Sequence, residues 1–210
     1  MLRADNVFRF DGLSFAAAAV ATDAVATPWR ALRVRRALRS GERVLIAGAG
    51  GLGLNAVQVA LNAGAAVAAV DPDGTHGRRR GRSARRSPWR GTRWRRSSRG
   101  ATAAPTSGSR RPAVPADSIP SPRPVRSGGR IVCCGCAPGS SWPLDSMRLV
   151  LSELAVIGSR ASSREDARAA VEAGEIVPAI ASTMQLEDVK DALVRLRGGG
   201  LAGRLVIEIP

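Results

Sequence analysis

Short apolar runs alternate with helical patterns along most of the chain. The runs Arg43–Ala47 (RVLIA) and Ala66–Val70 (AVAAV) each predict a buried strand, and residues 54–62 between them predict a helix. Gly64 is expected to end this helix, because the position after the last helical residue favours a left-handed conformation. The order of strand, glycine-rich loop, helix and second strand predicts one βαβ unit.

The same alternation continues on both sides of this unit. Residues 12–38 predict a helical stretch that Pro28 breaks, or in which Pro28 begins a second helix. Toward the C-terminus the pattern predicts strands at 131–136, 154–159 and 204–209, and helices at 144–151, 164–173 (with Ser162 or Ser163 as N-cap) and 186–197 (ended by Gly198–Gly200). Strands that alternate with helices predict an α/β fold with a mainly parallel, Rossmann-like sheet.

Residues 76–127 interrupt this pattern. They contain no Leu, one Ile and two Val, and Arg, Pro, Ser and Gly dominate. Such a segment buries too little apolar surface to offset the entropy lost on ordering, so we expect it to be disordered and the sheet to be incomplete. The expected organisation is a helical lead-in at 1–40, the first βαβ unit at 41–75, the Arg-rich segment, and the rest of the Rossmann domain with a C-terminal return at 128–210.

The formal net charge of +15 is concentrated in the same segment, which holds 15 Arg and one acidic residue. On one interpretation these arginines, with Trp89 and Trp94 between them, contact phosphates and stack on the bases of a nucleic acid. On the other, which we favour, the segment is a frameshifted translation of a GC-rich gene, since the chain has 31 Arg and one Lys. Translating the DNA in its other two frames distinguishes the two, because a frameshift predicts that Leu, Val, Glu and Asp reappear periodically.

Gly48, Gly50 and Gly53 form a G-x-G-x-x-G motif that follows a predicted strand and opens a predicted helix. In such a loop the first glycine allows the tight turn, the second lets a pyrophosphate approach, and the third lets helix and strand pack closely. Asp71 ends the next strand, where a carboxylate can accept hydrogen bonds from the ribose hydroxyls and repel a 2′-phosphate. The pattern favours NAD over NADP. The alternative is that these residues form only a glycine-rich turn and a solvent-facing Asp, with no cofactor bound.

Five stretches resemble the zinc-type medium-chain alcohol dehydrogenases. They are VATDAVATPWRAL, LRSGERVLIAGAGGLGLNAVQVALNAGAAVAAVDPDG, GGRIV, ELAVIGSRASSREDA and GGLAGRLVIEIP, and the resemblance covers about 1–75 and 128–210. It implies an NAD-dependent oxidoreductase that transfers hydride between an alcohol or carbonyl substrate and a nicotinamide cofactor, with a catalytic zinc as Lewis acid. It also implies a homo-oligomer.

The resemblance assigns roles to individual residues. Thr27 matches a catalytic position beside the nicotinamide, and Asp23 matches the third catalytic zinc ligand. Without the resemblance, Asp23 reads equally as a solvent-facing polar residue, and Arg204 as an exposed charge at a strand end. The cofactor-binding residues that the resemblance implies are Gly48, Gly50, Gly51, Leu52 and Gly53 at the pyrophosphate, Asp71 at the ribose, and Arg204 at the phosphates.

Zinc is not expected to be retained. A catalytic zinc site needs three protein ligands, and the family supplies the others from a β-rich catalytic domain that does not precede Asp23 here. Cys133, Cys134 and Cys136 lie on one predicted strand, where alternation puts Cys134 and Cys136 on one face and Cys133 on the other. The only histidine, His76, falls in the Arg-rich segment. We therefore expect a fragment that lacks full activity.

No apolar run reaches the roughly 18 residues that a membrane span needs, so no membrane contact is expected. Asp5, Asp11 and Asp23 interrupt the pattern of a secretory signal, and a cytoplasmic location is expected. The alternative function is a non-catalytic nucleotide-binding remnant whose Arg-rich segment binds nucleic acid nonspecifically.

Overall fold

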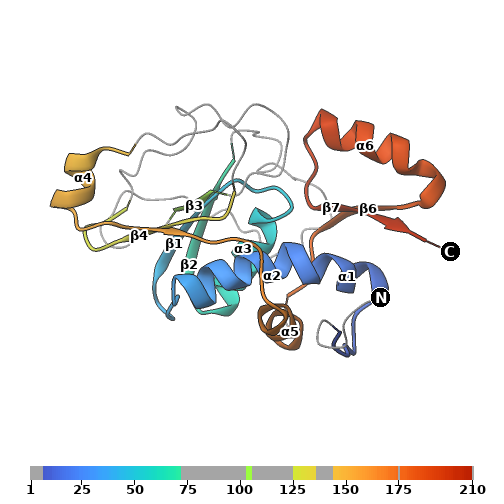
Figure 1. The fold of residues 1–210 in the computed structure, drawn as a ribbon, viewed down its shortest axis with the longest axis horizontal. Helices are drawn as coiled ribbons and strands as arrows, with labels where there is room; N and C mark the ends of the chain where they lie inside the picture. Colours follow the sequence, from blue (N-terminus) through green and yellow to red (C-terminus); the bar gives the residue numbers. More distant parts are fainter. Residues whose placement is uncertain (1–6, 72–102, 106–124, 136–143, 175, 210) are drawn as a thin grey trace, which may run out of the picture.

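The computed structural model describes residues 7–71, 103–105, 125–135, 144–174 and 176–209, which form an α/β fold (Figure 1). The described strands form one three-stranded sheet and two two-stranded sheets, and every described strand pairing is parallel. The predicted fold class, a partial Rossmann-like parallel sheet covered by helices, is confirmed.

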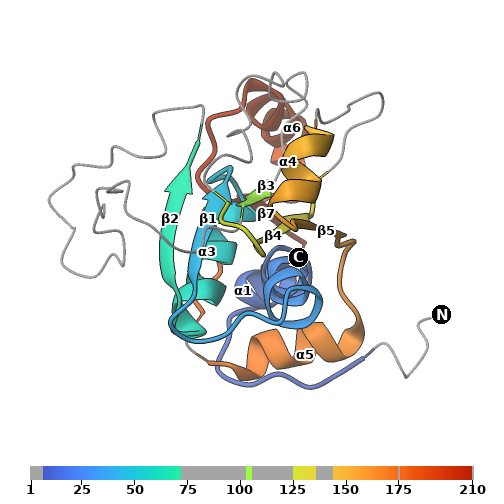
Figure 2. The same cartoon turned by 90° about the vertical axis from the view of Figure 1, so that its left-hand side faces the viewer.

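The central strand is β1 (Arg43–Ala47), which lies between β2 (Ala66–Val70) and β3 (Ala103–Pro105). Helix α3 (Gly53–Asn62) connects β1 to β2 and packs against both strands (Figure 2). Gly64 has a φ of 76°, so the predicted left-handed end of this helix is confirmed. The first βαβ unit is therefore present with the strand limits that the sequence predicts.

Strand β2 is more exposed than the sequence predicts. Its residues are all exposed or partly exposed, and Val70 is 42% exposed. The prediction of a fully buried strand is wrong here, because β2 pairs with β1 along one edge and no strand among the described residues pairs with its other edge. The apolar composition of AVAAV is typical of a buried strand, but whether a strand is buried depends on the elements that pack against it.

Strand β3 lies within 76–127, where no regular element is expected from the sequence. Ala103–Pro105 pairs with β1 from Leu45↔Ala103 to Ala47↔Pro105, and Val125 is buried at 1% exposure. At these positions the expectation of disorder is corrected, since a short strand needs only a neighbouring edge to bond to. The rest of 76–127 lies outside the described residues.

The lead-in is one continuous helical stretch. Helix α1 (Phe15–Val20), a π-helical segment (Ala21–Val25), α2 (Ala26–Trp29) and a second π-helical segment (Arg30–Arg35) follow one another without interruption. The prediction that Pro28 breaks this stretch or begins a second helix is wrong. Proline lacks an N–H and crowds the carbonyl four residues earlier, and the wide π turns on either side accommodate such a residue.

Further along the chain, β4 (Arg130–Cys133) pairs with β5 (Ala155–Gly158), and β4 also contacts β3. Helix α4 (Ser146–Leu151) connects them, and its N-cap Asp145 accepts hydrogen bonds from the first turn. Both strands and the helix are shorter than predicted. The pairing runs only from Arg130↔Ala155 to Cys133↔Gly158, and the helix begins after its cap, Asp145.

Ser163 is the N-cap of helix α5 (Arg164–Glu172), which settles the choice between the two candidate N-cap serines. The Ser163 hydroxyl accepts from the Asp166 N–H at 3.2 Å, and Asp166 accepts from the Ser163 N–H at 2.8 Å. Asp166 also pairs with Arg30 at 2.6 Å. Although burial raises the pKa of Asp166, the Ser163 N–H and Arg30 outweigh this effect and lower it. The ion pair joins α5 to the lead-in helix.

The C-terminal part forms a separate strand pair. Strand β6 (Ile180–Gln185) pairs with β7 (Arg204–Glu208), and a 3-10 turn (Leu186–Asp188) and α6 (Val189–Gly198) connect them. Figure 1 shows this unit at the end of the molecule opposite α4. Strand β6 was not predicted, because Ser182 interrupts the apolar residues on its inner face. Ile180, Ser182 and Met184 are partly buried there, and the residues between them are exposed.

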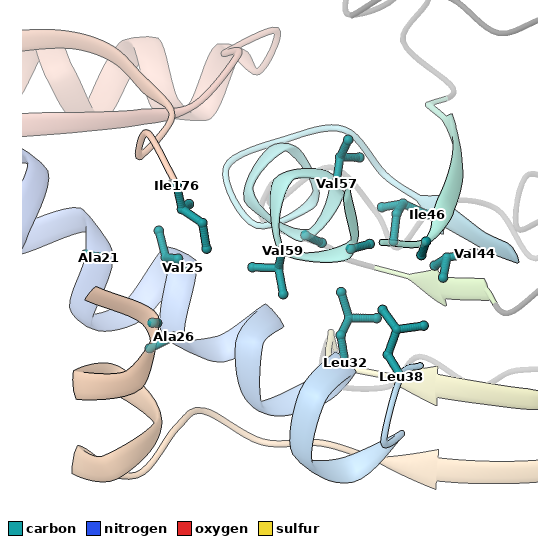
Figure 3. Packing of buried hydrophobic residues seen from close by; sticks show 14 of the residues in the cluster. Ala21, Val25, Ala26, Leu32, Leu38, Val44, Ile46, Val57, Val59 and Ile176 are labelled. Atoms are coloured by element: carbon teal, nitrogen blue, oxygen red, sulfur yellow. The ribbon is translucent and has the colours of Figure 1, made fainter. Parts of the chain in front are cut away.

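One hydrophobic core joins the lead-in helix, β1, α3 and α5 (Figure 3). Its fully buried members include Leu32 from the lead-in, Val44 and Ile46 from β1, and Val59 from α3. Ile176 from the segment before β6 completes it. The lead-in therefore packs directly on the βαβ unit. None of the described helices is long and apolar enough to cross a membrane.

Candidate dinucleotide-binding site

The segment Gly48–Gly53, called the glycine loop below, connects the end of β1 to the first turn of α3. Gly48 has a φ of 94°, a conformation that a side chain disfavours, and its N–H donates to Val70 O at 2.7 Å. The Leu54 N–H donates to Gly50 O at 3.0 Å, which begins the helix. The amide groups of a first helical turn lack intrahelical acceptors, so this loop presents donors suited to an anion.

The position of the loop in the sheet is also informative. Strand β1 pairs with β2 on one side and with β3, which follows much later in the chain, on the other. The strand that follows β1 in the chain therefore lies on one side of it, whereas β3, on the other side, contacts β4, the strand that follows β3. Ligands of open parallel sheets bind at such a switch point, outside the carboxyl ends of the strands.

Asp71 lies directly beyond β2, beside the loop. Its Oδ2 accepts a hydrogen bond from the Ala49 N–H at 2.5 Å. The structure therefore places the predicted ribose acid next to the predicted pyrophosphate loop, although they are separated by the whole helix α3 in sequence.

Arg204, the first residue of β7, reaches the loop from the C-terminal unit. A Cβ added to Gly51 would lie 2.9 Å from Arg204 Cδ, 3.0 Å from its Nε and 3.2 Å from Gly203 O. A Cβ added to Gly50 would meet nothing within 4 Å. Gly51 therefore allows the close approach of the arginine, whereas the space beside Gly50 is open.

Asp23 and Thr27 lie one helical turn apart on the lead-in. Asp23 Oδ1 accepts from the Thr27 hydroxyl at 3.1 Å, and its Oδ2 pairs with Arg204 Nη2 at 2.9 Å. The Asp23 side chain is 68% exposed and that of Arg204 33%, whereas Thr27 is buried. The structure thus brings Asp23, Thr27 and Arg204 together beside the glycine loop.

Asn55 is a residue that the sequence analysis missed. It is fully buried, its Nδ2 donates to Gly51 O at 2.8 Å, and its Oδ1 accepts from the Ala179 N–H at 3.0 Å. Ala179 O in turn accepts from the Arg204 N–H at 2.9 Å. One signal was present, because Asn55 lies four residues before Val59 and so on the apolar face of the helix.

The described residues offer few ligands for a metal ion. They contain no group of three or more His, Cys, Asp or Glu side chains that could hold a metal ion. Burial raises the pKa values of Cys133 and Cys134 to about 11, which disfavours the thiolate that binds metals. Cys136 and His76 lie outside the described residues. Asp23 faces a guanidinium, and this surrounding does not fit a zinc ligand.

The strand order, the glycine loop and the carboxylate beyond β2 together have the arrangement of a Rossmann-like unit. No family model matches the chain. A curated alcohol dehydrogenase from Moraxella sp. (strain TAE123) is 33% identical over 86 residues, which is 40% of this chain and 25% of that relative.

Solved structures of an alcohol dehydrogenase and a reductase are similar to more of the chain. A thermostable alcohol dehydrogenase from Pyrobaculum aerophilum has a TM-score of 0.74 and 25% identity, covering 99% of this chain and 62% of that protein. The acetophenone reductase from Geotrichum candidum NBRC 4597, in complex with NAD, has a TM-score of 0.72 and 27% identity, covering 94% and 57%.

These likenesses to alcohol dehydrogenases confirm the resemblance that the sequence predicts. The matched segment spans a quarter of the length of the curated relative. The roles of the individual site residues stay predictions.

Proposed function

We propose that this chain binds NAD at the glycine loop, as the nucleotide-binding part of an oxidoreductase acting on an alcohol or a carbonyl compound. The observation that carries the proposal is the contact of Asp71 with the Ala49 N–H, which puts a carboxylate beside the loop at the switch point of the sheet. The likeness to an NAD-bound reductase supports it.

In this proposal the pyrophosphate lies on the amide groups of the loop and the first turn of α3, near the Arg204 guanidinium. Asp71 accepts hydrogen bonds from the adenosine ribose and disfavours a 2′-phosphate, so NAD binds better than NADP. Thr27 lies toward the nicotinamide. When bound, NAD would accept hydride from an alcohol or, in its reduced form, donate hydride to a carbonyl compound, and the chain supplies binding and orientation. No step is assigned to zinc, since Asp23 faces Arg204.

Gly50→Ala tests this proposal. The added methyl group has open space in the folded chain, so stability should not change, whereas a pyrophosphate on the loop would collide with it. We expect the dissociation constant for NAD, measured by calorimetry, to rise at least about tenfold.

Gly198→Ala is the matched control, because its added Cβ also meets nothing within 4 Å and it lies at the end of α6. It should bind NAD as the unaltered chain does. Unchanged NAD binding by Gly50→Ala would exclude the loop as the cofactor site, and no NAD binding by the unaltered chain would exclude the function.

The concentration of 15 Arg in 76–127 supports a second candidate, nonspecific binding of nucleic acid. Replacing the arginines at 78–99 with Gln leaves β3 in place and should abolish retention on DNA at low salt. Retention that is unchanged by these replacements would exclude this candidate. A homo-oligomer and a cytoplasmic location remain predictions; a sedimentation experiment tests the first.

A further inference from the structure

We infer that Asp23 is a positioning residue that holds Arg204 over the glycine loop, in place of the metal-binding role that the family resemblance implies. This inference rests on the proposed function, since it concerns how the cofactor phosphates would be met. Contacts at both ends of Arg204 carry it: Asp23 binds the guanidinium, and Ala179 binds the backbone N–H.

At the side chain, the Asp23 carboxylate engages Arg204 Nη2 at 2.9 Å. The other carboxylate oxygen accepts from the Thr27 hydroxyl, which belongs to a buried residue and so limits the rotation of Asp23. A guanidinium has five N–H donors, and one ion pair to a single nitrogen leaves the fork able to face a second anion. The Nε group lies beside Gly51 of the loop.

At the backbone, the Arg204 N–H donates to Ala179 O at 2.9 Å, and the Ala179 N–H donates to the buried Asn55. Asn55 also binds Gly51 O, so the base of Arg204 is connected to the loop that its side chain approaches. The arginine is therefore held at its Cα end through Ala179 and at its guanidinium end by Asp23. Fixing a long side chain in advance lowers the entropy that a ligand must remove on binding.

The same geometry opposes a metal at Asp23. A guanidinium 2.9 Å from the carboxylate places a positive charge where a cation would bind, and the described residues contain no group of three ligating side chains. A zinc ion needs at least three protein ligands and a carboxylate not already neutralised by arginine.

A double-mutant cycle on NAD affinity tests the inference. Asp23→Asn keeps the size of the side chain and an acceptor for Thr27 but removes the charge that holds Arg204. Since the pair is partly exposed, we expect about threefold to fivefold weaker NAD binding. Arg204→Gln should weaken it more, and adding Asp23→Asn to Arg204→Gln should cause no further loss. Adenosine, which lacks phosphates, should bind equally to all four proteins.

Glu172→Gln is the matched control, because it removes the carboxylate of another exposed ion pair, with Arg168, away from the loop. It should leave NAD affinity unchanged. A loss by Asp23→Asn that persists in the Arg204→Gln background, or a loss of stability with no change in NAD affinity, would overturn the positioning role. So would zinc that the unaltered chain retains and Asp23→Asn does not. If the unaltered chain binds NAD but the effects of Asp23→Asn and Arg204→Gln on NAD affinity are independent, this inference alone is overturned. If the unaltered chain does not bind NAD, the proposed function is overturned.

Discussion

Asp71 and Ala49 are joined by a 2.5 Å hydrogen bond from the backbone N–H of the loop to the carboxylate at the end of β2. The residue that sequence reasoning assigns to a ribose thus also contacts the loop assigned to the pyrophosphate. Changes at this position should therefore affect both cofactor choice and the stability of the loop.

Replacing Asp71 by Asn keeps an acceptor for the Ala49 N–H and removes the negative charge. We expect the preference for NAD over NADP to fall by about tenfold, because the 2′-phosphate no longer meets a carboxylate. Dissociation constants for the two cofactors provide the measurement. Asp71→Ala, which also removes the acceptor, should in addition lower the free energy of unfolding by about 1–2 kcal/mol. An unchanged NAD to NADP ratio in Asp71→Asn would contradict the ribose role.

Gly48→Ala should destabilise the chain whether or not cofactor is present. The backbone at Gly48 has a φ of 94°, and a side chain in that region is strained by about 1–3 kcal/mol. Chemical denaturation followed by circular dichroism measures the loss. Gly50→Ala, two residues along the same loop, serves as the comparison and should unfold as the unaltered chain does. Equal stability of all three proteins would show that the loop does not hold this conformation.

Asn55→Ala should lower the free energy of unfolding by about 2–4 kcal/mol, because it leaves Gly51 O and the Ala179 N–H without their buried partner. Gln58→Ala is the control on the same helix. Gln58 also makes two hydrogen bonds to a backbone, with the N–H and the carbonyl of Val177, but these bonds are exposed. The free energy of unfolding lost in Gln58→Ala should therefore be well under half of that lost in Asn55→Ala. If the two variants lost equal stability, burial of Asn55 would not be the cause.

Glu42 makes the stability of the chain dependent on acid. It accepts from Arg36 at 2.8 Å, Arg130 at 2.5 Å and the Arg39 N–H at 2.9 Å, and so joins the lead-in, β1 and β4. Burial raises the pKa of Glu42, but the Arg39 N–H and the two guanidinium groups outweigh this effect and lower it. Burial lowers the pKa of Arg36, whose side chain is 3% exposed.

The sign of the acid effect follows from that direction. A carboxyl group with a lowered pKa in the folded state stabilises the fold fully above its ordinary value of 4.5, and this stabilisation is lost as the pH falls below it. Glu42→Gln should lower the free energy of unfolding at neutral pH by roughly 3 kcal/mol, since the buried Arg36 loses its ion pair with the Glu42 carboxylate. The difference between the two proteins should shrink between pH 5 and pH 3. A difference that does not vary over this range would assign the loss to packing.

Local patterns predicted the elements whose limits depend on neighbouring residues. The limits of β1 and β2, the left-handed Gly64 and a serine cap at 162 or 163 follow from apolar runs and from backbone preferences within a few residues. By contrast, β3 was not predictable, because three small residues become a strand only where the edge of β1 offers hydrogen-bond partners. The unbroken helix through Pro28 likewise depends on π turns that no local preference indicates.

In the candidate site, too, some features follow from local sequence and others depend on the tertiary structure. The sequence by itself determined the glycine loop, the acid that follows β2 and the resemblance that connects them, because spacing along one βαβ unit is a local property. Only the tertiary structure decided that Arg204 reaches Gly51 and pairs with Asp23, and that Asn55 connects the loop to Ala179. These contacts join residues more than a hundred positions apart, and the packing of the C-terminal unit against α3 and the lead-in creates them.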